Sequence, residues 1–186
     1  MTFDPMMVRP LFPALNQHIN QQPVLFFDGP GGSQVTQSVL DAMSHYLGHY
    51  NSNLGGAFFS SVETSALMAT ARHAAQTFVN APSASNMIFG ANMTTLTFQL
   101  SRAISRDWQK GDEVIVTALD HYSNVSSWQQ AAEDKGATVH QVRINKTNCD
   151  VDYEHFDALL TPRTKLVAIT YASNVTGSLI DMQRII

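Results

Sequence analysis

The sequence predicts an α/β fold of three layers, in which a mainly parallel sheet lies between two layers of helices. From residue 86 onward, short apolar runs alternate with longer segments whose apolar residues recur at helical spacing. Such alternation is typical of parallel strands joined by helical crossovers. Short polar segments directly follow three of the apolar runs. Ligands bind just beyond the carboxyl ends of parallel strands, so these three segments can meet at one ligand.

The first 22 residues mix prolines with apolar residues and read as an amino-terminal arm. We expect this arm to contain a short helix that begins at Val8 or Pro13 and ends at Asn20. Residues 23–186 are then expected to belong to one α/β domain.

Glycine and proline mark the ends of the predicted elements. A glycine-rich turn precedes a first long helix, which begins at residue 33 or 34 and ends at Gly48. Residues 61–80 form the second, because their apolar positions share one face until Pro82 follows. Asp152 is the expected N-cap of a later helix. The remaining elements, in order, are a strand at 87–90, a helix at 93–105, a strand at 114–116, a helix at 122–135, a strand at 138–144, a helix at 152–160 and a strand at 166–171.

Composition narrows the class of protein. Apolar residues make up 44% of the 186 residues and charged residues only 14%, against a usual charged fraction of about 25%. Much surface is therefore expected to be buried, inside the chain or in a dimer. The net charge of −4 and the absence of a basic run argue against nucleic-acid binding. A single cysteine, Cys149, and the lack of a signal peptide or a long apolar run predict a cytoplasmic protein without a membrane span.

Each of the three polar segments offers one candidate side chain. In the first segment, Ala91–Thr95, Thr94 lies where a strand passes into a helix, a place that favours phosphate but also suits a simple N-cap. In the second, Asp120–Asn124, His121 could stack on an aromatic ligand, act as acid or base, or be a surface histidine. The third segment, Ser173–Gly177, contains Asn174, whose amide could donate to a phenolate or carboxylate oxygen or close a turn.

The order and spacing of these segments resemble the class V aminotransferase family of pyridoxal-phosphate (PLP) enzymes, specifically its cysteine desulfurase branch. The likeness runs from about Val24 to Ile186. Val24–Gly32 looks like the opening segment of that family, and Asp120–Trp128 like its stretch of an acidic residue, His, two residues and Asn, followed by Trp. Thr164–Ile169 together with the third polar segment is similar to the next signature.

The resemblance implies the large domain of a fold-type I enzyme, a homodimer with pyridoxal 5'-phosphate as cofactor, and an amino-acid substrate, with cysteine as the candidate. No metal site is expected, because no third ligand is evident beside His45 and His49. Thr94 and the backbone N–H of Met93 would hold the cofactor phosphate. His121 would stack on the pyridine ring and assist proton transfers. Asn174 would donate a hydrogen bond to the 3-oxygen of that ring.

In the family, the Schiff-base lysine and the aspartate that pairs with the pyridine nitrogen lie beyond the segment matched by Ser173–Gly177. Residues 23–186 are therefore expected to be the amino-terminal part of the large domain, without that lysine, and inactive alone. Such a partial sheet should expose an apolar edge near Val114 or Leu166. Two alternatives are a self-contained α/β module that binds a phosphorylated small molecule, and a catalytically dead dimerisation remnant.

Overall fold

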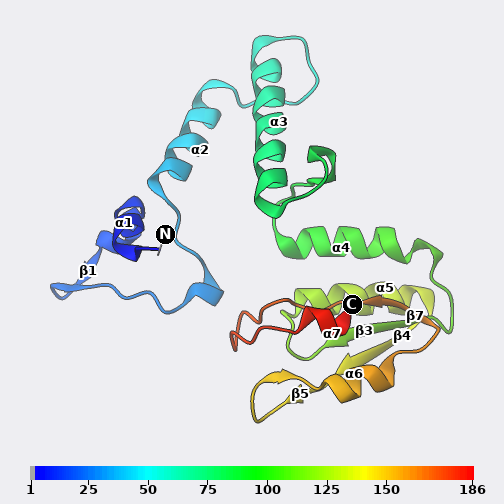
Figure 1. The fold of residues 1–186 in the computed structure, drawn as a ribbon. Helices are drawn as coiled ribbons and strands as arrows, with labels where there is room; N and C mark the ends of the chain where they lie inside the picture. Colours follow the sequence, from blue (N-terminus) through cyan, green and yellow to red (C-terminus); the bar gives the residue numbers. More distant parts are fainter. Residues whose placement is uncertain (1–2) are drawn as a thin grey trace. The chain divides into compact units, whose positions relative to one another are not determined.

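The structure is a computed structural model that describes residues 3–186, so the first two residues of the expected arm lie outside the described part. The chain divides into two compact units, Met1–Ile88 and Phe89–Ile186 (Figure 1). Within residues 3–186, no helix is long and apolar enough to span a membrane.

The first unit begins with short elements instead of the expected single helix. A proline lies at the start of each of three successive short turns, because it fixes φ and cannot donate a backbone hydrogen bond. A hairpin then occupies the place where the helix was expected to end, and Asn20 and Gln21 adopt positive φ in its turn. The predicted helix ending at Asn20 is therefore wrong. The elements are α1 (Pro5–Val8), η1 (Arg9–Leu11), η2 (Pro13–Asn16), β1 (His18–Ile19) and β2 (Gln22–Pro23).

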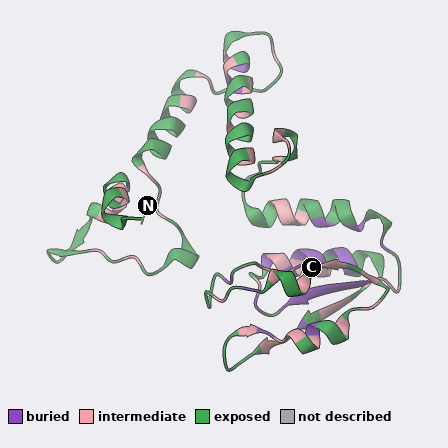
Figure 2. Cartoon of the chain, viewed as in Figure 1, coloured by how far each residue is buried: buried purple, intermediate pink, exposed green. Residues whose placement is uncertain are grey.

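Two long helices follow, as the sequence predicts. After the short turn η3 (Gly29–Gly31) come α2 (Gln37–His49) and α3 (Phe59–Val79), and η4 (Ala84–Asn86) ends the unit. The loop before α3 is tied to the helix by Ser61, whose hydroxyl donates to Asn53 O over 2.6 Å. Most residues of both helices remain exposed (Figure 2).

The second unit contains the predicted parallel sheet. Its strands are β3 (Glu113–Thr117), β4 (Thr138–Val142) and β7 (Thr164–Val167), in the order β4-β3-β7. β3 pairs in parallel with both neighbours, and all five of its residues are buried. Because β3 is the central strand, the expected exposed edge near Val114 is wrong, whereas Leu166 does lie in an edge strand of this sheet.

Helices cover both faces of this sheet. On one face, Val114 and Val116 pack with Trp128 of α5 (Ser123–Lys135). On the other face, Ile115 packs with Phe156 of α6 (Tyr153–Leu159). Alternate residues of β3 thus serve opposite cores, as the two-residue period of a strand requires. Figure 2 shows the burial concentrated in β3 and α5. The other elements are α4 (Met93–Ile104), η5 (Ser105–Asp107), β5 (Ile144–Asn145), β6 (Asp150–Val151) and α7 (Met182–Ile185).

The strand predicted at residues 87–90 is absent, and this segment instead runs as irregular chain into α4. Ile88 is 75% exposed. A strand forms only where a neighbouring backbone accepts and donates its hydrogen bonds, and the described sheet pairs β3, β4 and β7 only with one another. The apolar pattern of this segment was therefore not enough to make it a strand.

Candidate functional site

The helices α4 and α5 begin side by side. Met93 is the first residue of α4, Ser123 is the first residue of α5, and the Ser123 hydroxyl lies 3.2 Å from the Met93 sulfur. At the other end, Lys135 Nζ donates to the carbonyl of Arg106, just after α4, over 3.3 Å. The two helices therefore run in the same direction, and the positive ends of both helix dipoles lie together.

The first turn of α4 keeps backbone donors free. Asn92 is the N-cap, and its Oδ1 accepts from the backbone N–H of Thr95 over 2.8 Å. Thr94 is exposed and lies inside the helix, so the capping role considered for it belongs to Asn92. Within residues 3–186, the N–H groups of Met93 and Thr94 have no hydrogen-bond acceptor. The start of α4 thus offers two amides and a hydroxyl to an anion.

A close approach of the chain shapes this turn. A Cβ placed on Gly90 would lie 2.5 Å from Cδ2 of Leu96, closer than atoms can approach. Glycine therefore allows the segment before α4 to pass directly over the first turn of the helix.

The second polar segment is held rigidly at the carboxyl end of β3. The carboxylate of Asp120 accepts from the hydroxyl of Thr117 and from Nδ2 of Asn124, the latter over 2.7 Å. Asn124 Oδ1 in turn accepts from Trp128 Nε1 over 3.0 Å. This chain of hydrogen bonds joins the strand, the turn and α5, and thereby fixes the turn that carries His121.

His121 is exposed, but only one edge of its ring is engaged. Its Nδ1 lies 2.7 Å from the hydroxyl of Ser123 and 3.2 Å from the backbone nitrogen of Ser123. Within the described residues, Nε2 has no hydrogen-bond partner. The ring is thus held from one side and open on the other.

The third polar segment is anchored to the second through Ser173. This serine is buried, and its hydroxyl donates to the carbonyl of Leu119 over 3.3 Å. The same oxygen accepts from the N–H groups of Val175 and Thr176. Asn174 lies between Ser173 and Val175 and is exposed, and its side chain has no hydrogen bond to the described residues.

Polar contacts therefore link the three polar segments into one site. Ser123 connects Met93 with His121, and Ser173 joins the segment of Asn174 to the turn after β3. Thr94 belongs to the same helix start as Met93, but among the described residues its side chain makes no hydrogen bond to the other segments. The sequence did not single out Ser123 or Ser173, although both are small polar residues within two positions of a candidate.

This donor set fits a phosphorylated aromatic ligand. Free amides at paired helix starts suit a phosphate, an exposed imidazole suits the face of an aromatic ring, and the free amide of Asn174 suits an oxygen on that ring. PLP carries all three features, so the residues present fit this cofactor.

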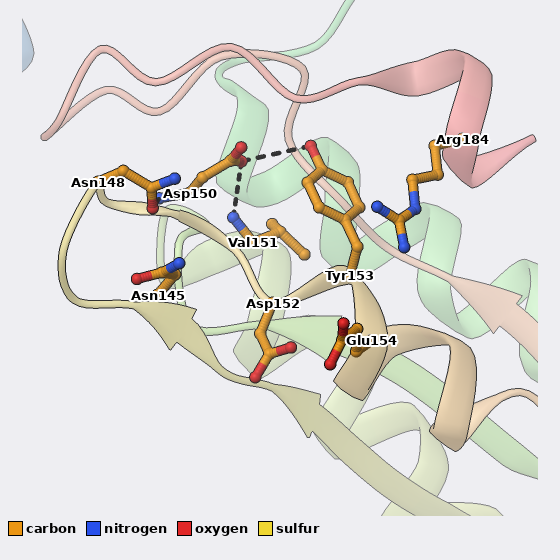
Figure 3. A pocket seen from close by; sticks show the side chains of 8 residues that line it. All are labelled: Asn145, Asn148, Asp150, Val151, Asp152, Tyr153, Glu154 and Arg184. Atoms are coloured by element: carbon orange, nitrogen blue, oxygen red, sulfur yellow. Dashed lines mark hydrogen bonds between the residues drawn. The ribbon is translucent and has the colours of Figure 1, made fainter.

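An open hollow of about 480 Å³ lies away from this site, between the β5–β6 hairpin and the starts of α6 and α7 (Figure 3). Tyr153 occupies its centre, where the phenol donates to Asp150 over 3.3 Å and accepts from the N–H of Asp181 over 2.9 Å. Burial raises the pKa of the Tyr153 phenol, and the guanidinium of Arg184 lies 4.7 Å from the centre of its ring. The Tyr153 hydroxyl is already paired within the protein, and the hollow adjoins none of the three polar segments.

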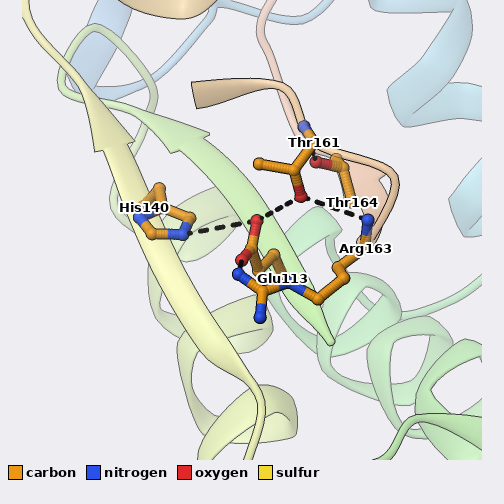
Figure 4. Close-up of polar contacts among 5 residues, drawn as sticks. All are labelled: Glu113, His140, Thr161, Arg163 and Thr164. Atoms are coloured by element: carbon orange, nitrogen blue, oxygen red, sulfur yellow. Dashed lines mark hydrogen bonds and ion pairs between the residues drawn. The ribbon is translucent and has the colours of Figure 1, made fainter. Parts of the chain in front are cut away.

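A second polar cluster lies at the opposite, amino end of β3 (Figure 4). The buried carboxylate of Glu113 accepts from the Thr161 hydroxyl over 2.7 Å and is paired with Arg163, and His140 Nε2 lies 3.7 Å away. The Thr161 hydrogen bond is the main cause that lowers the pKa of Glu113; Arg163 and His140 lower it further, while burial opposes them. Because this cluster ties β7 to β3 and β4 at the far end of the sheet, we assign it to the fold.

Comparisons with known proteins agree with this geometry. The profile of the family described as aminotransferase class V matches residues 25–186. A curated relative, the probable cysteine desulfurase of Vibrio cholerae, is 33% identical over 173 residues, which are 92% of this chain and 43% of that protein. The chain thus spans less than half the length of this relative.

Two solved structures share the fold. The apo structure of a cysteine desulfurase from Thermococcus onnurineus NA1 is 21% identical, with a TM-score of 0.85 over 99% of this chain and 44% of that one. A variant of C-DES that has glycine covalently linked to its PLP cofactor is 20% identical, with a TM-score of 0.70 over 95% and 44%.

Proposed function

Because the chain belongs to the class V aminotransferase family, we propose that it is the amino-terminal part of a PLP-dependent enzyme that transforms an amino acid. The observation that carries this proposal is the linkage of three polar segments beside two parallel helix starts. When bound, PLP would supply an electron sink for the chemistry. The protein would supply binding, orientation and proton control.

Each segment has a proposed task. The N–H groups of Met93 and Thr94, with the Thr94 hydroxyl, would hold the phosphate, because the positive ends of two helix dipoles attract its charge. His121 would cover one face of the pyridine ring and assist proton transfers. Asn174 would donate its amide hydrogen to the 3-oxygen of the ring.

We propose cysteine as the candidate substrate, since the Vibrio cholerae relative is a probable cysteine desulfurase. The chain alone would be inactive, because none of its lysines lies at the polar segments. Lys165 is paired with Asp112 at 3.6 Å, at the amino end of the sheet, and Lys135 bonds to the carbonyl of Arg106 at the far end of α5. Lys146 lies in the β5–β6 hairpin and Lys110 beside Gly136.

The match over residues 25–186 does not favour a self-contained module of another class.

Cofactor binding by the purified chain tests this proposal. PLP should bind more tightly than pyridoxal, which lacks the phosphate, by about 10- to 100-fold, the effect of charge-assisted hydrogen bonds worth about 1.5–3 kcal/mol. His121→Ala should weaken the binding of both compounds, and Ser126→Ala, on an adjacent turn without a role in the site, should leave it unchanged. Equal affinity for PLP and pyridoxal would rule out the phosphate site.

Two further measurements address the whole protein. The chain is mixed with PLP and reduced with borohydride, and mass spectrometry should then find no lysine that is labelled in preference to the others. One specifically labelled lysine would contradict the proposed inactivity. The gene should continue beyond Ile186 in the same reading frame and encode the aspartate and lysine signatures of the family. A stop codon directly after Ile186 would instead support a remnant.

The whole enzyme would be a homodimer in the cytoplasm. Exposed apolar residues along α2 support a partner surface, since Val39, Met43 and Leu47 are 43%, 58% and 61% exposed. The exposed free thiol of Cys149 supports a reducing compartment. Light scattering of the whole protein should give twice the mass of one chain, and a monomer at every concentration would exclude the dimer.

A further inference from the structure

The feature that carries a further inference is the double contact of Ser123 with one nitrogen of His121. Both the hydroxyl and the backbone nitrogen of Ser123 face Nδ1, at 2.7 Å and 3.2 Å. Ser123 is 5% exposed, so its polar groups must find partners within the protein. Whether the hydroxyl and the N–H of Ser123 find a partner in His121 depends on whether Nδ1 carries a proton.

The backbone N–H of Ser123 settles the direction of these bonds. As the first residue of α5, Ser123 has no acceptor inside its own helix, and Nδ1 is the acceptor that the described residues offer it. If Nδ1 carried a proton, two N–H groups would point at each other and this donor would stay unpaired. Nδ1 is therefore an acceptor.

The hydroxyl of Ser123 follows from that assignment. It has one hydrogen and two possible acceptors, Nδ1 at 2.7 Å and the Met93 sulfur at 3.2 Å. A thioether is a weak acceptor, whereas an imidazole nitrogen without a proton is a good one. The hydroxyl therefore donates to Nδ1, while its contact with Met93 keeps the ring beside the start of α4.

We propose that Ser123 is a positioning residue that holds His121 in the neutral tautomer with its proton on Nε2. The ring then presents an N–H donor on its open side and cannot accept a proton there. The tautomer follows from contacts within the chain, whereas its consequence for the reaction rests on the proposed function. For a bound cofactor or substrate, His121 would therefore offer a hydrogen bond from Nε2 and could not act as a base through that nitrogen.

Nitrogen NMR of the ligand-free chain tests this inference. With ¹⁵N-labelled histidine at a pH of about 8, above the usual pKa of histidine, the His121 ring should show a bare Nδ1 and a protonated Nε2. Ser123→Ala should raise the share of the Nδ1-protonated ring about fivefold, the effect of one ordinary hydrogen bond. Ser123→Thr, which keeps the hydroxyl, should restore the original spectrum, and Ser126→Ala should not alter it.

A proton on Nδ1 in the unchanged chain would overturn the inference, whether or not any variant folds. A spectrum of Ser123→Ala identical to that of the unchanged chain would remove the hydroxyl from the positioning role. PLP binding is measured separately, so its failure alone would reject the proposed function and leave the tautomer assignment intact.

Discussion

Asp120 is the residue whose removal should most directly loosen the candidate site. Its carboxylate accepts one hydrogen bond from Thr117, at the end of β3, and one from Asn124, in the first turn of α5. A hydrogen bond to a charged group is worth about 1.5–3 kcal/mol. Asp120 is only half-buried, so water replaces part of this loss, but Thr117 is 1% exposed and its hydroxyl would be left without an acceptor. Asp120→Ala should therefore cost about 3 kcal/mol.

Urea unfolding followed by tryptophan fluorescence measures this cost. Trp108 and Trp128 are both buried in the second unit, with ring centres 6.4 Å apart, and Trp128 bonds to the Asn124 side chain that Asp120 holds. With a urea slope of about 1–3 kcal/mol per molar, the midpoint should fall by about 1–3 M without a change in slope.

Two variants sharpen the comparison. Asp120→Asn can still accept one of the two hydrogen bonds, so it should lose about half as much. Asp134→Ala, which removes an exposed carboxylate from the same helix region, should stay within about 0.5 kcal/mol of the unchanged chain. If Asp120→Ala and Asp134→Ala unfold at the same urea concentration, Asp120 does not hold this turn and the reasoning fails.

Three other predictions concern the fold around the site. The folded state lowers the pKa of Glu113, so the contribution of this carboxylate to stability is present above the unfolded pKa near 4.5 and is lost as the pH falls through the folded pKa. The difference in stability between the unchanged chain and Glu113→Gln, read from urea midpoints, should therefore shrink below pH 4.5. A constant difference would contradict this. Phe156→Ala should cost about 3–5 kcal/mol in thermal unfolding, since this side chain is 1% exposed in the core beneath the sheet. If the thermal midpoint falls no further than in the exposed control Leu160→Ala, this prediction fails. Gly136→Ala should cost about 1–2 kcal/mol in the same assay, because Gly136 ends α5 at φ 68°; an equal midpoint would show that the backbone relaxes there.

The sequence predicted the second unit better than the first, for a physical reason. Strand β3 and helix α5 lie in a layered core, so their apolar periods reflect real burial on either side. Asp152 is the predicted N-cap of α6, and its side chain accepts from the N–H of His155. In the arm, by contrast, Pro5, Pro10 and Pro13 divide the chain into turns before any helix can propagate.

The features that the sequence did not predict depend on contacts between residues far apart in the chain. The segment at residues 87–90 has a strand pattern, but pairing depends on a neighbouring strand, which a local pattern does not reveal. Likewise, Met93 and Ser123 lie 30 residues apart, and their contact arises only because α4 packs against α5. The candidates Met93, Thr94, His121 and Asn174 were chosen from sequence order, and their roles remain predictions.

The division of the chain at Ile88 has a consequence for engineering. Every residue assigned to the candidate site belongs to Phe89–Ile186, which has its own sheet and both hydrophobic cores. The first unit could therefore be exchanged for that of a relative while the residues of the candidate site stay the same. Chimaeras joined at this boundary would therefore separate the contribution of the candidate site from that of the exposed helices α2 and α3.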